Sequence, residues 1–191
     1  MNSTQSDSLK FLTIELPAWV DAFVAGFGGS LEDDQGRMRL AIALSRQNLA
    51  HGGGPFGAAV FAGSRVLGAA VNWVLPSGLS IAHAEILALM RAESRYGLGA
   101  NSPLGPWTLV TSTEPCCQCF GALIWAGVTH VVCGATTEDA ESIGFDEGPK
   151  PKEWVQALQK RGITVARGVQ RDKARRVLQE YKARGGTIYG N

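Results

Sequence analysis

The chain has 191 residues, of which 45% are hydrophobic, so it is long enough for one domain with a sizeable core and too apolar for a disordered chain. Its 18 Lys and Arg residues balance 17 Asp and Glu residues, for a formal net charge of +1. This balance excludes the strong basic field with which many proteins hold a nucleic-acid backbone, although it is compatible with a local basic surface. No apolar stretch reaches the roughly 20 residues that a membrane-spanning helix needs.

The first residues, MNSTQSDSLKFLTIELPAW, lack the basic and then apolar order of a secretory signal, so we expect a cytoplasmic protein. In a reducing cytosol the four cysteines are better interpreted as free thiols or metal ligands than as disulfides. Residues 1 to about 15 are polar and rich in Ser and Thr, and we expect them to be poorly ordered. The prediction is therefore a partly disordered N-terminal extension over residues 1–30 and a single domain over residues 31–191.

Apolar periodicity and turn residues predict the elements of the chain in order. A short helix is expected within 16–29, and an amphipathic helix from Asp33 to the glycines that follow His51. Two apolar runs, 57–61 and 66–71, predict a β-hairpin. The remaining elements are helix 83–95, strand 107–111, helix 115–125, strand 128–134, helix 153–161, strand 163–166, and a helix capped by Asp172 that ends at Ala183. This order predicts an α/β fold with three layers, α/β/α, around a mixed, mostly five-stranded sheet.

Two short motifs each open a predicted helix: Ala82-His83-Ala84-Glu85 and Glu114-Pro115-Cys116-Cys117-Gln118-Cys119. One histidine and a Cys-x-x-Cys pair supply the three nitrogen and sulfur ligands of a catalytic zinc site, in which water takes the fourth position. We therefore expect His83, Cys116 and Cys119 to bind Zn²⁺. The positive ends of the two helices would help to keep the thiols deprotonated.

Glu85 is better placed as a proton shuttle than as a metal ligand. Residues two apart on a helix point about 200° away from each other, so His83 and Glu85 reach one site only if both lie in the first turn. The upstream segment 76–78, Pro-Ser-Gly, predicts a loop and is consistent with a helix that begins there. Glu85 would take a proton from the attacking water and pass it to the substrate and then to the leaving amine.

Together, H-x-E and P-C-x-x-C are the signature of zinc-dependent nucleobase deaminases. The chain resembles the cytidine deaminase-like superfamily from about Arg37 to its C-terminus, and segment 53–58, GGPFGA, is similar to the loop before the first strand in its purine-acting branch. Segment 143–147, IGFDE, the late helix with Tyr181 and the tail 186–189, GTIY, resemble the guanine deaminase group. The resemblance implies a zinc-dependent hydrolase that converts guanine to xanthine and ammonia, or that acts on a related amino-triazine ring.

The resemblance also implies roles for individual residues. Asn72 would hydrogen-bond the ring, Phe56 would stack on it, and the backbone of Ala84 would bind its carbonyl oxygen. The segment with Phe145 would contribute further contacts to the substrate. The tail would cover the site in a homodimer that exchanges its C-terminal segments.

Two carboxylates in the 143–147 segment have competing interpretations. The resemblance implies that Asp146 or Glu147 contacts the far edge of the ring, and that Glu147 acts as a second proton shuttle. A solvated loop that turns at Gly148-Pro149 is the alternative. The chain departs from the group's usual pattern at Cys117, where a residue other than Cys is common, and in its longer N-terminus.

Other residues have plainer interpretations beside the functional one. A Cys-x-x-Cys pair by itself also occurs in structural zinc sites and redox pairs. We expect Cys117 and Cys133 to be small buried hydrophobic residues, and His51 and His130 to lack a functional role. Phe56 and Trp125 are also compatible with the core. The basic late helix is interpreted as a solvated face, with nucleic-acid contact as the alternative; its basic residues are Arg171, Lys173, Arg175, Arg176, Lys182 and Arg184.

Three other functions compete with deamination of guanine. A tRNA adenosine deaminase would use the basic late helix to hold RNA, which the near-neutral charge argues against. A cytosine or cytidine deaminase would use the same zinc motifs. A zinc-stabilised binding module would have no need of Glu85, so that residue favours catalysis.

Overall fold

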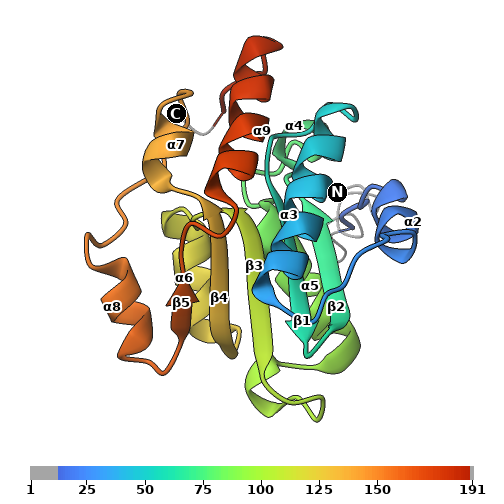
Figure 1. The fold of residues 1–191 in the computed structure, drawn as a ribbon, viewed down its shortest axis with the longest axis vertical. Coiled ribbons are helices and arrows are strands. Elements are labelled where there is room, and N and C mark those ends of the chain that lie inside the picture. The colour runs from blue at the N-terminus through green and yellow to red at the C-terminus, as the bar shows by residue number, and fades with distance from the viewer. Residues whose placement is uncertain (1–12, 190–191) are drawn as a thin grey trace, which may run out of the picture.

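The computed structural model describes residues 13–189, and a single five-stranded sheet forms its centre (Figure 1). The strands are β1 (Gly57–Ala62), β2 (Arg65–Val71), β3 (Trp107–Thr113), β4 (Val128–Ala135) and β5 (Thr164–Ala166). Their spatial order is β2-β1-β3-β4-β5, with β1 antiparallel to both neighbours and with β3, β4 and β5 parallel. The predicted mixed, five-stranded α/β fold is therefore confirmed.

Helices cover both faces of the sheet, because alternate side chains of a strand point to opposite faces. In β1, Ala58 and Val60 belong to one core cluster, whereas Ala59 and Phe61 belong to the other. The first cluster packs against α5 (Ala84–Tyr96), α6 (Cys117–Trp125) and α8 (Trp154–Gln159). The second packs against α3 (Asp34–Leu49) and α9 (Arg171–Ala183), which lie in front of the sheet in Figure 1. These are the three layers that the sequence predicts.

The N-terminal region packs against this core from α2 (Trp19–Ala25) onward. α2 buries Val20 and lies against β2 and α3, which confirms the short helix expected within 16–29. The expected poor order of the first residues concerns mainly residues 1–12, which lie outside the described part of the chain, and the boundary at residue 30 stays a prediction. Within residues 13–189, no helix is both long and apolar enough to cross a bilayer.

Several elements differ from the predicted ones. The one-turn helix α4 (Val74–Ser77) replaces the expected loop and ends at Gly78, whose φ is +67°. The short helices η1 (Gly99–Asn101) and α7 (Thr137–Glu141) are absent from the predicted set. Thr136 and Asp139 form a capping box at the start of α7, and this pattern is visible in the sequence.

The expected cap of α9 is wrong. The residue before the helix is Gln170, in the left-handed region with a φ of 53°, and no side chain caps this end. Asp172 lies inside the first turn and pairs with Arg175. Trp125 is also not a core residue, because 81% of its surface is exposed.

The topology brings distant loops to one edge of the sheet. The parallel strands β3 and β4 end at the same edge, and β1 begins there beside the end of β2. The register pairs Gly57 of β1 with Val71 of β2, and Ala58 with Thr111 of β3. The loops before β1 and after β2, β3 and β4 therefore converge, as crevices at strand ends do in open α/β sheets.

Candidate active site

Three potential metal ligands lie at the starts of α5 and α6. His83 and Cys116 are the N-cap residues of these helices, and Cys119 lies in the first turn of α6. The Nδ1 atom of His83 lies 3.4 Å from Sγ of Cys116 and 3.6 Å from Sγ of Cys119. Tetrahedral zinc with bonds of about 2.1 Å to nitrogen and about 2.3 Å to sulfur would separate such atoms by about 3.6 Å. All three ligand atoms lie within 4.8 Å of one another, so they are positioned to bind zinc.

The two cysteines of this group share a hydrogen bond. Cys119 donates to Cys116, which together with the nearby His83 lowers the pKa of Cys116 to about 4 in spite of its burial. The same bond raises the pKa of Cys119, and burial raises it further. One thiolate is therefore present at neutral pH, and a metal cation would favour loss of the second proton.

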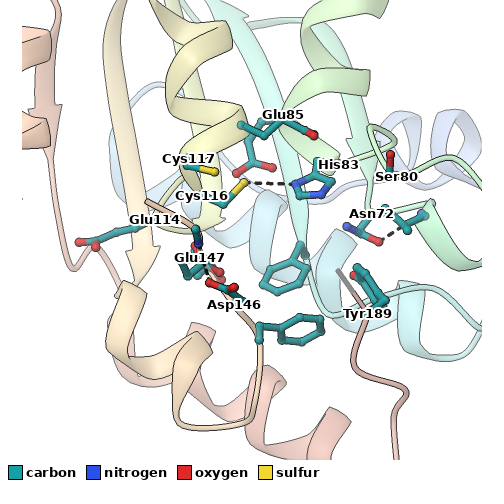
Figure 2. A pocket seen from close by; sticks show the side chains of 16 residues that line it. Asn72, Ser80, His83, Glu85, Glu114, Cys116, Cys117, Asp146, Glu147 and Tyr189 are labelled. Atoms are coloured by element: carbon teal, nitrogen blue, oxygen red, sulfur yellow. Dashed lines mark hydrogen bonds between the residues drawn. The ribbon is translucent and has the colours of Figure 1, made fainter. Parts of the chain in front are cut away.

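Glu85 lies beside the three ligands, at the second position of α5 (Figure 2). It is only 7% exposed, and its Oε1 accepts a hydrogen bond of 3.2 Å from Oγ1 of Thr111. Burial raises the pKa of Glu85, and the charge of Cys116 adds to this effect. A carboxyl group with a raised pKa can hold and release a proton near neutral pH. The expectation that His83 and Glu85 reach one site from the first turn of a helix is confirmed, because both line the same cavity.

A cavity of about 290 Å³ opens beside these residues. Its wall has two parts, which we call the metal side and the loop side. The metal side consists of His83, Glu85 and Cys116. Cys119 lies within reach of His83 and Cys116 but does not line the cavity. The loop side comes from the loops at the strand ends and consists of Phe56, Asn72, Phe145 and Glu147. Asp146 lines this wall as well, so the structure brings the metal-ligand candidates together with five of the predicted substrate contacts.

Aromatic rings make up much of the loop side. The ring centroid of Phe145 lies 5.0 Å from that of Phe56 and 5.1 Å from that of Tyr189, both in edge-to-face arrangements. Tyr189 belongs to the C-terminal tail, which is held near the domain by a 2.6 Å hydrogen bond from the Tyr181 hydroxyl to the carbonyl of Thr187. The tail therefore reaches the cavity of its own chain, and its tyrosine lines the wall.

Asn72 is 1% exposed and follows β2 directly. Its Oδ1 accepts a hydrogen bond of 3.3 Å from the backbone N–H of Val74. This bond fixes the orientation of the amide, and Figure 2 shows Nδ2 on the cavity side. Asn72 thus offers a donor to a ligand.

The two carboxylates of the 143–147 segment lie in different environments. Glu147 is 6% exposed, and burial together with the nearby Cys116 thiolate raises its pKa to about 8. Asp146 is exposed, and its Oδ1 accepts a 2.8 Å hydrogen bond from the N–H of Gly148 within the turn. Both residues line the cavity, but only Glu147 is buried in it. The solvated-loop interpretation therefore fits Asp146 and fails for Glu147.

Cys117 is not the buried hydrophobic residue that the sequence predicts. It is half-buried and lines the cavity, and its backbone N–H donates to the carbonyl of Glu147 at 2.9 Å. Its Sγ packs against Gly148, where an added Cβ would lie 2.4 Å from the sulfur. Cys117 therefore ties the loop with Glu147 to the start of α6. Cys133 is fully buried, as predicted.

The two remaining histidines lie outside the cavity, in agreement with the expectation. His51 stacks on Trp19 with 4.7 Å between ring centroids. His130 bonds to Asp34 at 3.1 Å and to Thr164 at 2.7 Å. On α9, ion pairs join Arg171 to Asp139, Arg175 to Asp172, and Arg184 to Glu180. Lys173 and Lys182 donate to Gln170 and Ser142, so five of the six basic residues considered for nucleic-acid contact are engaged within the chain.

Glu114 is a buried carboxylate directly before Pro115, and no sequence motif indicates its role. Its Oε1 accepts from Nε of Arg167 at 2.5 Å, and its Oε2 accepts from the N–H and hydroxyl of Thr137 at 3.1 and 3.0 Å. Lys150 donates to the carbonyl of Pro115 at 2.7 Å and to the Thr137 hydroxyl at 2.8 Å. Both ends of segment 137–150 are thus fastened to the residues that precede α6. Figure 2 shows the Glu114 side chain pointing away from the metal ligands.

Comparisons with known proteins agree with this geometry. Residues 31–135 match the family model of the cytidine and deoxycytidylate deaminase zinc-binding region. The guanine deaminase of Bacillus subtilis is 35% identical over 111 residues, which are 58% of this chain and 69% of that protein. The structure of a guanine deaminase from Nitrosomonas europaea is 43% identical with a TM-score of 0.85, covering 91% of this chain and 97% of that chain. A protein solved in complex with 2,6-diaminopurine is also 43% identical, with a TM-score of 0.88 over 95% of this chain and 98% of that chain.

The matched region includes both zinc motifs, and the three ligand atoms have the spacing that zinc requires. The carboxylate beside them is placed for proton transfer. The chain belongs to the cytidine and deoxycytidylate deaminase zinc-binding family and is a zinc-dependent hydrolytic deaminase.

Proposed function

We propose that the chain is a guanine deaminase, which hydrolyses guanine to xanthine and ammonia. The observation that carries this proposal is the pairing of the metal side with a buried carboxyl group, Glu147, across a small aromatic cavity. A cavity of about 290 Å³ lies at the small end of ligand sites, so it suits a single flat base better than a polynucleotide. Related amino-triazine rings have the same planar, amino-bearing edge and are possible additional substrates.

His83, Cys116 and Cys119 would hold the zinc ion. A zinc ion with three protein ligands would act as a Lewis acid. It would lower the pKa of a water molecule bound to it to about 7. One histidine and two thiolates balance its two positive charges, and they leave one position for a reactant.

Glu85 would move the protons of the reaction. It accepts a proton from the attacking water, delivers it to a ring nitrogen, and assists the departure of the amine as ammonia. The balance is one water consumed and one ammonia released, with the ring carbon bonded to oxygen in place of nitrogen. Burial and the hydrogen bond from Thr111 support this role, since they favour an oriented carboxyl group with a raised pKa.

The loop side would bind the ring. Phe56 and Phe145 offer apolar faces and edges for stacking, and Asn72 offers its Nδ2 donor. The backbone N–H of Ala84, in the first turn of α5, would bind the carbonyl oxygen of the base.

Glu147 would contact the far edge of the ring and act as the second proton shuttle. Its pKa of about 8 keeps it mainly protonated at neutral pH, so it can donate to a nitrogen of the substrate. Asp146 lines the cavity beside it, but its side chain is used in the turn with Gly148, which favours Glu147 for this role.

The tail would cover the bound base through Tyr189. In the single chain the tail lies at its own cavity, and we propose a cytoplasmic homodimer in which the two copies exchange these C-terminal segments, so that each tail takes the same place on the other copy. An exposed apolar surface on α5 and α6 is available for contact between copies, with Met90 at 44% and Trp125 at 81% exposure. Light scattering of the purified chain, together with the exchange of tails between tagged copies, tests this arrangement.

An ammonia-release screen tests the function directly. The zinc-loaded chain is assayed with guanine, guanosine, adenine, cytosine, cytidine, an amino-triazine and a tRNA anticodon stem-loop. We expect guanine to give the highest kcat/KM. Cytidine or the stem-loop as the sole good substrate would overturn the proposal, while leaving the metal assignment intact.

A further inference from the structure

Asn48 is a buried polar residue in the last turn of α3, outside the cavity wall. It is 0% exposed, and its Nδ2 donates two hydrogen bonds, to the carbonyl of Gly54 at 2.9 Å and to that of Asn72 at 2.8 Å. Two carbonyl acceptors identify this end of the amide as the nitrogen. One side chain therefore joins the loop before β1 to the residue after β2.

These two carbonyls belong to a closed set of backbone contacts around the ring-binding residues. The N–H of Asn72 donates to the carbonyl of Phe56 at 3.0 Å, and the N–H of Phe56 donates to that of Gly54 at 2.9 Å. Asn48, which does not line the cavity, adds the two side-chain hydrogen bonds to the carbonyls of Gly54 and Asn72. The backbone of Asn72 is consequently held at both its N–H and its C=O.

Two glycines make room for this arrangement. A Cβ on Gly53 would lie 2.2 Å from Nδ2 of Asn48. A Cβ on Gly54 would lie 2.1 Å from the Tyr189 hydroxyl and 3.0 Å from Oδ1 of Asn72. The carbonyl of Asn48 also accepts from the N–H of Gly53 at 3.1 Å. The GGG segment thus lets the loop approach the asparagine closely enough for both bonds.

We infer that Asn48 is a positioning residue, which sets the direction of the Asn72 amide and the height of Phe56 over the base. Its two bonds fix the backbone on which both side chains are mounted, whereas Asn48 itself does not line the cavity. The inference rests on the proposed function, in which Asn72 and Phe56 bind the ring. A misplacement of about 1 Å in such groups is enough to lower turnover strongly.

A double-mutant cycle tests this role. Asn48→Ala is made in the wild-type chain and in an Asn72→Ala background, and kcat, KM and zinc content are measured for all four proteins. We expect Asn48→Ala to lower kcat/KM for guanine by about ten-fold, mainly through KM, with zinc retained. In the Asn72→Ala background the same change should cost clearly less than in the wild-type chain, because one of the two side chains that Asn48 positions is already gone and only the displacement of Phe56 remains.

Ser45→Ala is the matched control. Ser45 is on the same helix, is equally buried, and donates only to the carbonyl of Ile42 within that helix. Ser45→Ala removes one buried hydrogen bond, against two for Asn48→Ala, and it should change kcat/KM by less than about two-fold. If Asn48→Ala does not fold, Asn48→Ser, which can reach at most one of the two carbonyls, takes its place in the cycle.

Two outcomes overturn the inference: a kcat/KM for the Asn48 variant equal to that of Ser45→Ala, or an equal loss in both backgrounds of the cycle. The wild-type rate on guanine tests the proposed function separately. If another ring is the substrate, the same four-protein cycle is run on that ring, and the ratios between variants still decide the role of Asn48.

Discussion

The two sides of the cavity are built in different ways. On the metal side, every functional group comes from the first turn of α5 or α6, within four residues of a helix start. On the loop side, the groups come from loops that long-range hydrogen bonds, such as those of Asn48 and Glu114, and packing against the core hold in place. Local geometry thus positions the metal-ligand candidates, whereas the tertiary fold positions the residues that we propose to contact the substrate. Substitutions on the two sides should therefore have different effects on kcat, on its pH dependence and on kcat/KM.

Removal of the proton shuttle should give the largest effect. Glu85→Gln keeps the shape of the side chain but cannot accept the proton of water, so we expect kcat to fall by about 10³-fold with zinc content unchanged. Elemental analysis and ammonia release on the same sample measure both quantities. Loss of the metal in this variant would show that Glu85 is a ligand and would contradict the assignment. Glu93→Gln, on the same helix but away from the cavity, is the control and should be fully active.

On the loop side, Glu147→Gln should lower kcat for guanine by about 10²-fold with zinc retained. The pKa of Glu147 is raised to about 8 by burial, so the carboxyl group loses its proton as pH rises through that value. If it donates a proton in the reaction, wild-type kcat should decline above pH 8, and this decline should be absent in the variant.

The pH profile also separates Glu147 from its neighbour. Asp146→Asn removes an exposed carboxylate that accepts from Gly148 in the turn, so it should leave the decline above pH 8 in place. Undiminished guanine turnover by Glu147→Gln would contradict the second-shuttle role.

The difference between the two sides also explains what the sequence could predict. His83, Glu85, Cys116 and Cys119 were accessible from their spacing, because their geometry depends on two helix starts, of which Pro115 marks the second. The mixed sheet and its three layers followed from the hairpin and the alternation of helices and strands, whereas the order of the strands is known only from the structure. These features depend on residues close together in the chain.

The loop side was accessible only through family resemblance. Nothing near Asn72 in the chain indicates that Asn48, 24 residues earlier, fixes its backbone. The burial of Glu147 depends on the contact between Cys117 and Gly148, and the exposure of Trp125 depends on which helix face is left uncovered. Each of these features depends on the tertiary structure, and no pattern in the neighbouring sequence indicates it. The α7 helix is the exception, since its capping box was present in the sequence.

The smallest predicted effect on activity comes from weakening the hydrogen bonds that hold segment 137–150 to Glu114 and Pro115. Arg167→Met removes the cation that pairs with the buried carboxylate of Glu114, which then holds Thr137 less firmly. Because Glu147 lies on this segment, we expect kcat/KM for guanine to fall by about ten-fold with zinc retained. Arg167→Lys should restore part of the loss.

Arg171→Met is the matched control for this last prediction. Arg171 is as exposed as Arg167, at 49% against 47%, and it pairs with a buried carboxylate, Asp139, that has no bond to the residues preceding Cys116. Both variants should lower the melting temperature, because each leaves a buried carboxylate without its cation. Only Arg167→Met should lower kcat/KM by more than about two-fold. Equal activity losses in the two variants would mean that the segment is positioned by general stability, and that Glu114 makes no specific connection between the loop side and the metal side.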